Sequence, residues 1–353
     1  MASIKEIAKL AGVSPATVSR VLNRPDYKCR DAEARDRIWK AAIELDYAPN
    51  EAARSLRKSA AGGDGAARTA YRINVLMTRS EAKQTDPFFT ELLHIIESEI
   101  HNHGHILTNV WHMPDFSDDR KCRQLDLPEI IDGLYRQTNG QNNGLIIIGR
   151  CSHDVIALLQ KKFKNLVSVN RNSTNYAIDE VLCDGEKVSS MAVEYLIKLG
   201  HTAIGYVGAC YGEARFRGFQ ETLLAHKLYM DPAFVIETHQ TEQEGYRAME
   251  HILRSEYRPG AIYCANDITA IGMLDCLKHF RSLSYTPAII ASDNIERAQF
   301  SDPMLTTIAL PKEEMGRFAI SLLLDRIRGG HASVVRMELE GKLLVRDSCV
   351  SVL

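Results

Sequence analysis

The sequence predicts a small all-α domain at the N-terminus, followed by a large α/β body of two doubly wound subdomains with parallel sheets. Helix start and stop signals recur three times within the first 46 residues. Beyond residue 70, short apolar runs alternate with segments of helical period, which is typical of parallel sheets flanked by helices. A chain of 353 residues is also too long for one compact core.

The three helices predicted at the N-terminus form a helix-turn-helix domain. The first runs over 3–11 and ends at Gly12, which supplies a left-handed exit. The second begins at once, because Ser14 is a good N-cap and Pro15 a good first helical residue. The third covers 31–46 and turns an apolar face inward. Two short helices joined by a tight glycine-containing turn and backed by a third predict this motif.

Four segments follow along the chain. Residues 1–48 form the head. Residues 49–58 have enough length for two helical turns, which are too short to be stable alone in water, and we interpret them as a hinge. Residues 59–70 are rich in Gly and Ala without an apolar pattern, as in a flexible linker. Residues 71–353 form the body, which is long enough for two subdomains.

The alternation of patterns in the body predicts its elements in order. The predicted strands are Ile73–Met77, Ile106–Val110, Leu145–Gly149, Leu166–Asn170, Ile204–Val207, Phe234–Glu237, Ala261–Cys264 and Ala288–Ala291. The predicted helices are 88–102, 184–199, 213–227, 242–255 and 266–280. Ligands of open α/β sheets bind beyond the carboxyl ends of the strands, so binding residues are expected directly after the strands.

Charge is distributed unevenly between the head and the body. The formal net charge is -2, but residues 1–58 hold 12 Lys+Arg against 8 Asp+Glu, whereas the rest holds 31 against 37. A basic head on an acidic body suits the binding of a polyanion by the head.

The second helix presents small or hydrogen-bonding side chains on the face away from its apolar stripe. These side chains are Pro15, Ala16, Thr17, Ser19, Arg20 and Asn23. Such a face fits the major groove of DNA, where Arg20 can grip guanine O6 and N7 with two parallel hydrogen bonds. The hydroxyls suited to phosphates are those of Ser14, Thr17 and Ser19. An ordinary solvated helix face that carries one arginine is the alternative interpretation.

The sequence contains no recognisable motif for metal binding, catalysis or membrane insertion. Eight cysteines are scattered without C-x-x-C pairs or zinc-finger spacing, so we expect buried reduced thiols, no metal and no cofactor. No P-loop, H-E-x-x-H or catalytic triad is recognisable, which argues against an enzyme. The sequence shows neither a signal peptide layout nor an apolar run of about 18 residues, so we expect a cytoplasmic protein without membrane contact.

The N-terminal residues resemble a known family. Residues 4–23, IKEIAKLAGVSPATVSRVLN, are similar to the head of the lac/gal repressor family, and YAPN (47–50) and ARSL (53–56) resemble that family's hinge. The resemblance implies binding to double-stranded operator DNA by a homodimer whose hinges fold in the minor groove. Leu56 matches the leucine that separates central base steps, although a core position in a helix is the plainer explanation for a leucine. The hinge residues that match positions near the DNA are Tyr47, Asn50 and Ala53.

The resemblance extends into the body. Five blocks of the body are similar to motifs of the family. GHTAIGYVG (200–208) resembles G-H-x-x-I-x-x-x-G, RFRGF (215–219) resembles R-x-x-G-F, and AND (265–267) resembles A-N-D. SDN (292–294) resembles the acidic strand-end motif, and PMLTTI (303–308) resembles P-x-L-T-T. They imply a periplasmic-binding-protein-like body, in which two subdomains clamp a ligand. Two features depart from the family: the linker between Leu56 and Ile73 is longer, and residues 112–144 align with no motif.

A sugar effector is expected between the subdomains. A sugar presents hydroxyls that both donate and accept, so carboxylates and guanidinium groups recognise pairs of them. The expected effector-binding residues are Phe88, Asp184, Tyr211, Arg215, Asn266 and Asp293. For the Asn and Asp residues, capping of the following helix is the alternative role.

The resemblance implies a dimeric repressor of a carbohydrate-utilisation operon, which we expect a small, galactoside-like sugar to control allosterically. A regulator that responds to a purine or another metabolite, a solute-binding protein of a sugar transporter, and an enzyme are the alternatives. A ligand-turnover assay separates the enzyme from the binding proteins.

Overall fold

The computed structural model describes residues 4–23, 34, 37, 38, 41, 45, 70–79, 86–280 and 285–352. The chain divides into two compact units, Met1–Thr69 and Ala70–Leu353. The predicted hinge over 49–58, with Tyr47, Asn50, Ala53 and Leu56, lies outside the described residues.

The head is built around a small apolar core. Its described helices are α1 (Ile4–Ala11) and α2 (Pro15–Asn23). They are joined at Gly12, which has a φ of 66° and therefore a conformation that glycine adopts without strain. Ile7 and Val18 are fully buried against Ile38, which lies in the third predicted helix. This arrangement confirms the helix-turn-helix fold of the head.

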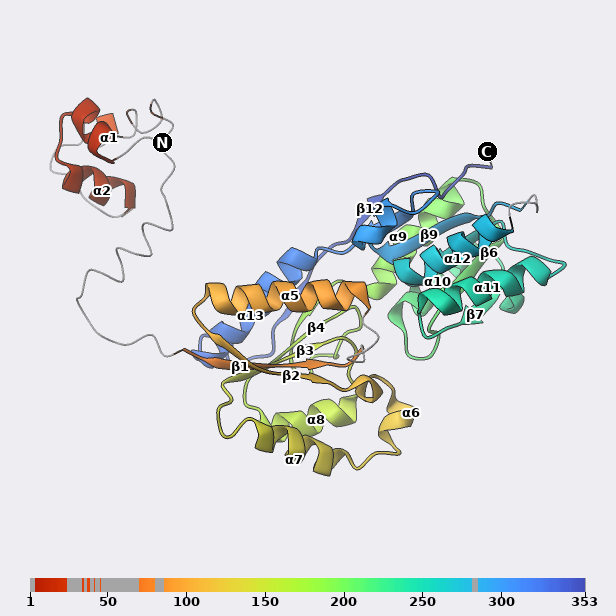
Figure 1. Cartoon of the computed structure of the whole chain (residues 1–353), viewed down its shortest axis with the longest axis horizontal. Helices are drawn as coiled ribbons and strands as arrows, with labels where there is room; N and C mark the ends of the chain where they lie inside the picture. The colour runs from red at the N-terminus through yellow and green to blue at the C-terminus, as the bar shows by residue number, and fades with distance from the viewer. Residues whose placement is uncertain are drawn as a thin grey trace. The chain divides into compact units, whose positions relative to one another are not determined.

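The Ala70–Leu353 unit consists of two lobes, each with one sheet (Figure 1). The first sheet has the order β11-β5-β4-β3-β1-β2, and its strands are parallel. Its strands are β1 (Arg72–Met77), β2 (Ile106–His112), β3 (Gly144–Ile148), β4 (Leu166–Asn170), β5 (Asp179–Leu182) and β11 (Arg336–Glu338). Its helices are α5 (Pro87–Asn102), α6 (Asp119–Cys122), α7 (Leu127–Gln137), α8 (His153–Lys162) and α13 (Lys312–Ile327), with η1 (Pro114–Ser117).

The second sheet has the order β12-β10-β9-β8-β6-β7, and only β12 runs antiparallel to its neighbour. Its strands are β6 (Ile204–Gly208), β7 (Val235–Glu237), β8 (Ala261–Cys264), β9 (Ala288–Asp293), β10 (Thr306–Ala309) and β12 (Lys342–Leu344). Its helices are α9 (Gly185–Lys198), α10 (Ala214–Ala225), α11 (Glu242–Arg254) and α12 (Asp267–His279), with η2 (Pro232–Phe234) and η3 (Glu296–Gln299). Two parallel-sheet lobes of this kind confirm the predicted fold class.

Alternate residues of β3 show why the strands are continuously apolar. Ile146 and Ile148 belong to the core beneath α5 and α13, whereas Leu145 and Ile147 belong to the core beneath α7 and α8. Helices therefore cover both faces of the sheet, and both faces must be apolar. Figure 1 shows α5 and α13 on one side of the first sheet and α7 and α8 on the other.

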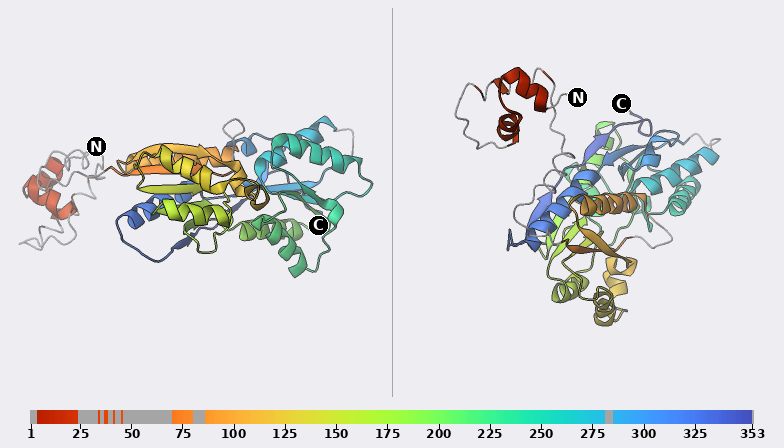
Figure 2. Two further views of the ribbon diagram at one scale, coloured as in Figure 1. Left: turned by 90° about the horizontal axis from the view of Figure 1, so that it is seen from below. Right: turned by 60° about the vertical axis from the view of Figure 1, so that its left-hand side comes forward.

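The chain passes between the lobes three times, after β5, after β10 and after β11. Figure 2 shows from two further directions that the two lobes are separate layered bodies lying next to each other. Residues 112–144, which align with no motif, contain η1, α6 and α7 of the first lobe. No helix among the described residues has the length and hydrophobicity needed to cross a bilayer.

Candidate functional site

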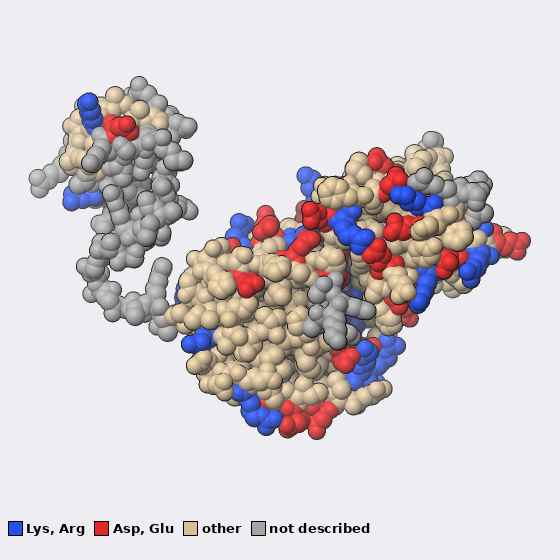
Figure 3. Space-filling view, in the orientation of Figure 1, with Lys and Arg blue, Asp and Glu red and all other residues tan. Residues whose placement is uncertain are grey.

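The carboxyl ends of the two sheets face each other, and direct contacts connect them. Asn172, after β4, accepts a hydrogen bond through its Oδ1 from the backbone N–H of Ala214 at 2.8 Å. Arg150, after β3, donates to the backbone oxygen of Tyr211 at 3.2 Å. We call this boundary between the lobes the seam. Figure 3 shows acidic and basic side chains on both lobes around it.

A buried ion pair crosses the middle of the seam. The guanidinium of Arg171, after β4, binds the carboxylate of Asp293, at the end of β9, and the two side chains are 3% and 1% exposed. Burial raises the pKa of Asp293 to about 6, even though Arg171 opposes this shift. Asp293 has a φ of 124°, a strained conformation for a residue with a side chain, and such strained residues cluster at functional sites. The predicted ligand residue Asp293 therefore lies between the lobes.

Arg215 is the centre of a second buried cluster, at the start of α10. Its Nε donates to Glu213 at 2.8 Å, its Nη1 to the backbone oxygen of Ala265, and its Nη2 to Gln240 at 3.2 Å. Burial alone would raise the pKa of Glu213, but Arg215 and Arg79 hold it well below its usual range. Glu213 therefore remains ionised in the seam.

Gln240 leaves one buried donor without a partner. Its Oε1 accepts from Arg215, whereas its Nε2 is buried and has no hydrogen-bond partner. Gln240 also has a φ of 66°. A buried polar group without a partner costs about 1–3 kcal/mol, so it needs an explanation. Its position beside Arg215 suits a ligand that accepts a hydrogen bond.

Asn266 caps α12, which is the alternative role considered for this residue from the sequence. Its Oδ1 accepts from the backbone N–H of Thr269 at 3.3 Å, and its Nδ2 donates to the backbone oxygen of Gln240 at 3.2 Å. The side chain is fully buried. Asn266 therefore lies beside the cluster and positions the Gln240 backbone.

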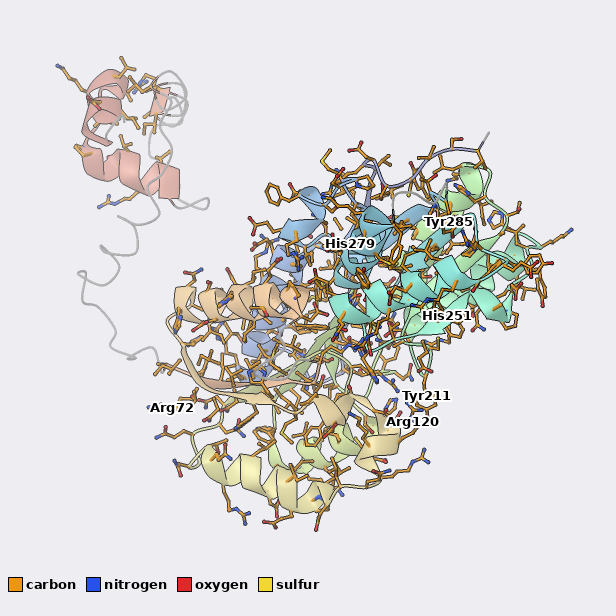
Figure 4. All side chains as sticks on the ribbon, turned by 45° about the vertical axis from the view of Figure 1, so that its right-hand side comes forward. Arg72, Arg120, Tyr211, His251, His279 and Tyr285 are labelled. Carbon is orange, nitrogen blue, oxygen red and sulfur yellow. The ribbon has the colours of Figure 1, made fainter. Side chains whose placement is uncertain are left out.

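Tyr211 lies at the rim of the seam and is 46% exposed. The guanidinium of Arg120, from α6 of the other lobe, lies 4.5 Å from the centre of its ring, and that of Arg150 lies 6.0 Å away. Figure 4 shows Tyr211 and Arg120 next to each other. Tyr211 therefore connects the lobes, and its ring already carries a cation on one face.

Phe88, in the first turn of α5, is 1% exposed. The guanidinium of Arg171 lies 4.8 Å from the centre of its ring and 5.2 Å from that of Phe89. The Arg171 guanidinium therefore packs on a face of the Phe88 ring, and that face is not open to a ligand.

Asp184 does not join these residues. Its carboxylate accepts from the backbone N–H of Glu186 at 2.9 Å, which caps α9, and lies 3.6 Å from Arg336. It lines a separate groove of about 280 Å³ beside Glu338 and Gly341. The capping role therefore describes the contacts of Asp184, and the expectation that it lies with the other effector residues is not met.

Sequence reasoning missed four residues of the seam, namely Arg79, Arg171, Glu213 and Gln240. Each follows a strand, after β1, β4, β6 and β7 respectively. The rule that ligands bind beyond strand ends covers all four positions, but the sequence does not show which side chains turn into the seam.

In the head, part of the proposed DNA-reading face of α2 can be described. Pro15 and Arg20 are exposed, and Ser14 caps the helix by accepting from the backbone N–H of Thr17 at 3.2 Å. The hydroxyls of Ser14 and Thr17 are 2.9 Å apart. The backbones of Ala16, Ser19 and Asn23 are helical, but their side chains lie outside the description.

Comparison with known proteins agrees with both halves of this architecture. Residues 3–50 match the model of bacterial regulatory proteins of the lacI family, and residues 193–349 match that of a periplasmic binding protein-like domain. The chain is 30% identical over 366 residues to the HTH-type transcriptional repressor PurR of Haemophilus influenzae, and the alignment covers all of both chains.

Two solved structures show the same fold. One is the lac repressor dimer bound to operator and the anti-inducer ONPF, with 21% identity, 99% coverage of each chain and a TM-score of 0.66. The other is a LacI family transcriptional regulator from Enterococcus faecium with bound ribose, with 25% identity, a TM-score of 0.64, and coverage of 80% of this chain and 100% of that one. The family consists of regulators, so the protein is not an enzyme. The chain belongs to the LacI family of DNA-binding transcriptional repressors.

Proposed function

We propose that the protein is a homodimeric repressor of a carbohydrate-utilisation operon and that a small sugar, galactoside-like in size and hydroxyl pattern, binds in the seam and controls it. The observation that carries the proposal is the buried donor Gln240 Nε2, which has no partner although it lies beside Arg215. Asp293 and Arg171 come from opposite lobes and form an ion pair across the same seam, where the charge of Arg215 also acts on Asp293. A ligand that bonds to both lobes shifts the balance between lobe arrangements, which is the basis of allosteric control.

The chemistry of the seam favours a sugar over a flat base. Carboxylates and guanidinium groups recognise neighbouring hydroxyls in a fixed geometry. The aromatic rings that could stack on a purine already carry a guanidinium on one face, namely Arg171 on Phe88 and Arg120 on Tyr211. The relative from Enterococcus faecium holds a sugar, ribose. A purine effector is the second candidate, because the relatives that are about 30% identical carry the name PurR.

A thermal-shift screen over sugars and nucleobases tests the effector, since a ligand that binds only the folded state raises stability by RT ln(1+[L]/Kd). A sugar should raise the unfolding temperature of the wild type and have little effect on Gln240→Leu. Gln243→Leu, at an exposed position of α11, is the control and should respond like the wild type. A response to nucleobases alone contradicts the sugar proposal.

For DNA recognition, we propose that α2 lies in the major groove and that Arg20 is its main contact to a base. Arg20→Ala should weaken operator binding by about 1–3 kcal/mol and relax the base preference at its contact. Lys9→Ala, on the exposed side of α1, removes the same charge and should weaken binding to all sequences equally. An unchanged ratio between operator and random duplex for Arg20→Ala contradicts this assignment.

We further propose that two heads of one dimer bind the two halves of a pseudo-palindromic operator. The lac repressor, which shares the fold, binds its operator as a dimer. Sedimentation of the protein with a full operator and with a half operator tests this. Binding of one chain per full operator contradicts the proposal.

A further inference from the structure

Arg79 is the one basic residue of the seam that lacks an acidic partner among the described residues. It follows β1 and Thr78, and its backbone packs against Gly149, where an added Cβ would lie 3.2 Å from the Cβ of Arg79. The other basic residues around the seam form ion pairs: Arg120 with Asp118, Arg150 with Asp119, Arg171 with Asp293, Arg215 with Glu213, and Lys312 with Glu91. No ion pair or hydrogen bond of the Arg79 side chain is present in the described part of the chain.

The surroundings of Arg79 are the charged groups of the seam. Burial lowers the pKa of its guanidinium, the charge of Glu213 acts against this shift, and those of Arg215 and Arg171 add to it. Asp86 is also near, but its carboxylate already accepts from the backbone N–H of Phe88 at 3.0 Å as the cap of α5. Arg79 therefore lies near the guanidinium groups of Arg171 and Arg215, which already form ion pairs with Asp293 and Glu213.

An unpaired, partly buried cation is unfavourable in the ligand-free protein. A guanidinium that loses water without gaining an anion is destabilising, and such groups gather at functional sites. The buried Nε2 of Gln240 is a second donor without a partner in the same cluster around Arg215. Two free donors point to a ligand that accepts several hydrogen bonds at one end. A carboxylate or phosphate group has this chemistry and suits the planar fork of an arginine.

We propose that Arg79 is the residue that recognises a negatively charged oxygen group on the effector, so that the effector is an acidic or phosphorylated sugar. This inference rests on the proposed function, because it places the group on a sugar held in the seam. Arg79 selects for the charge, while the pairs formed by Arg171 and Arg215 supply the groups that bind hydroxyls.

Calorimetric titrations with galactose, galacturonate and galactose 6-phosphate test the proposal on the full chain. The wild type should bind one of the charged sugars at least tenfold more tightly than galactose, and which of the two binds identifies carboxylate or phosphate. Arg79→Gln should remove this preference while keeping the affinity for galactose. Arg254→Gln, at an exposed position of α11, is the charge-matched control and should behave like the wild type.

The stability of the Arg79→Gln variant without ligand gives an independent test. Arg79 has no ion pair or hydrogen bond to lose, and the attraction of its charge to Glu213 is opposed by burial and by the charges of Arg215 and Arg171. Arg79→Gln should therefore unfold in urea at the same concentration as the wild type or at a higher one. A clear fall in stability shows that Arg79 is paired and overturns the inference. Equal binding of galactose and both charged sugars, or a charge preference that survives in Arg79→Gln, also overturns it but leaves the sugar effector intact. Binding of nucleobases alone overturns both proposals.

Discussion

Replacement of Arg171 by Met should destabilise the protein in a way that depends on pH. Arg171 lowers the pKa of the buried Asp293, which still stands at about 6, above the ordinary value of 3.8. Stability from this group therefore falls as pH rises from about 4 to 6, and in the wild type it levels off above pH 6. In Arg171→Met the pKa of Asp293 is higher, so the loss continues beyond pH 6. The methionine keeps an apolar chain over Phe88.

The size of the effect follows from that pKa. Each pH unit above 6 favours the ionised carboxylate of the wild type by about 1.4 kcal/mol. The extra loss in Arg171→Met should be near zero at pH 5.5 and should grow at pH 7 and pH 8 by on the order of 1 kcal/mol per pH unit above pH 6, until the higher pKa of Asp293 in the variant is reached. It adds to a constant part from the lost hydrogen bond.

Urea unfolding at these three pH values measures the difference. Arg217→Met is the control, because Arg217 is 52% exposed and its pair with Glu186 contributes less than about 1 kcal/mol at every pH. A loss in Arg171→Met that is the same at all three pH values refutes the account of Asp293.

Three further predictions concern the packing of α11 on α12, the ion pairs of His331 and the hinge. A Cβ at Gly272 would lie 1.9 Å from the backbone oxygen of Glu242, so Gly272→Ala should force α11 and α12 apart and cost at least about 2 kcal/mol in urea unfolding. Gly133→Ala on α7, where an added Cβ would meet only Arg136 Nη2 at 4.0 Å, should be neutral or stabilising. The ring of His331 contacts Asp325 at 2.6 Å and Asp179 at 2.9 Å, and these carboxylates raise its pKa. The stabilisation is complete below about pH 6.5 and is lost as pH rises through the raised pKa, so the cost of His331→Gln, about 1 kcal/mol at pH 6, should shrink towards pH 9. Leu56→Ala should reduce operator bending in a gel-mobility assay, and unchanged bending contradicts the proposed role of the hinge.

The strands that the sequence predicts are those with continuous apolar runs. β3 consists of Gly144–Ile148 and is buried on both faces, so its pattern shows directly in the sequence. β5 was not predicted because it begins with Asp179 and Glu180, which are charged yet buried. Arg326, 147 positions away, binds Asp179, and the backbone N–H and hydroxyl of Thr174, in the preceding loop, donate to Glu180. These partners compensate the burial of the two carboxylates at the start of β5.

The site was predicted in part for a similar reason. Arg215 and Asp293 lie in the seam, where the motifs placed them, and their contacts to a ligand remain a proposal. Arg171 could not be identified from the sequence because its partner, Asp293, lies 122 positions away along the chain. Sequence patterns do not show which distant side chains form an ion pair. Asp184 has the right residue type after a strand, but its carboxylate turns towards its own helix.

The control of the DNA-binding head by the seam can be measured by titrating an operator duplex in the presence and absence of the sugar found in the screen. Fluorescence anisotropy gives the Kd of the wild type and of Asp293→Asn. The sugar should change the operator Kd of the wild type at least tenfold, a coupling of about 1.4 kcal/mol, and should leave that of Asp293→Asn unchanged. A sugar that binds the protein without changing the operator Kd would contradict the claim that the seam controls the DNA-binding head.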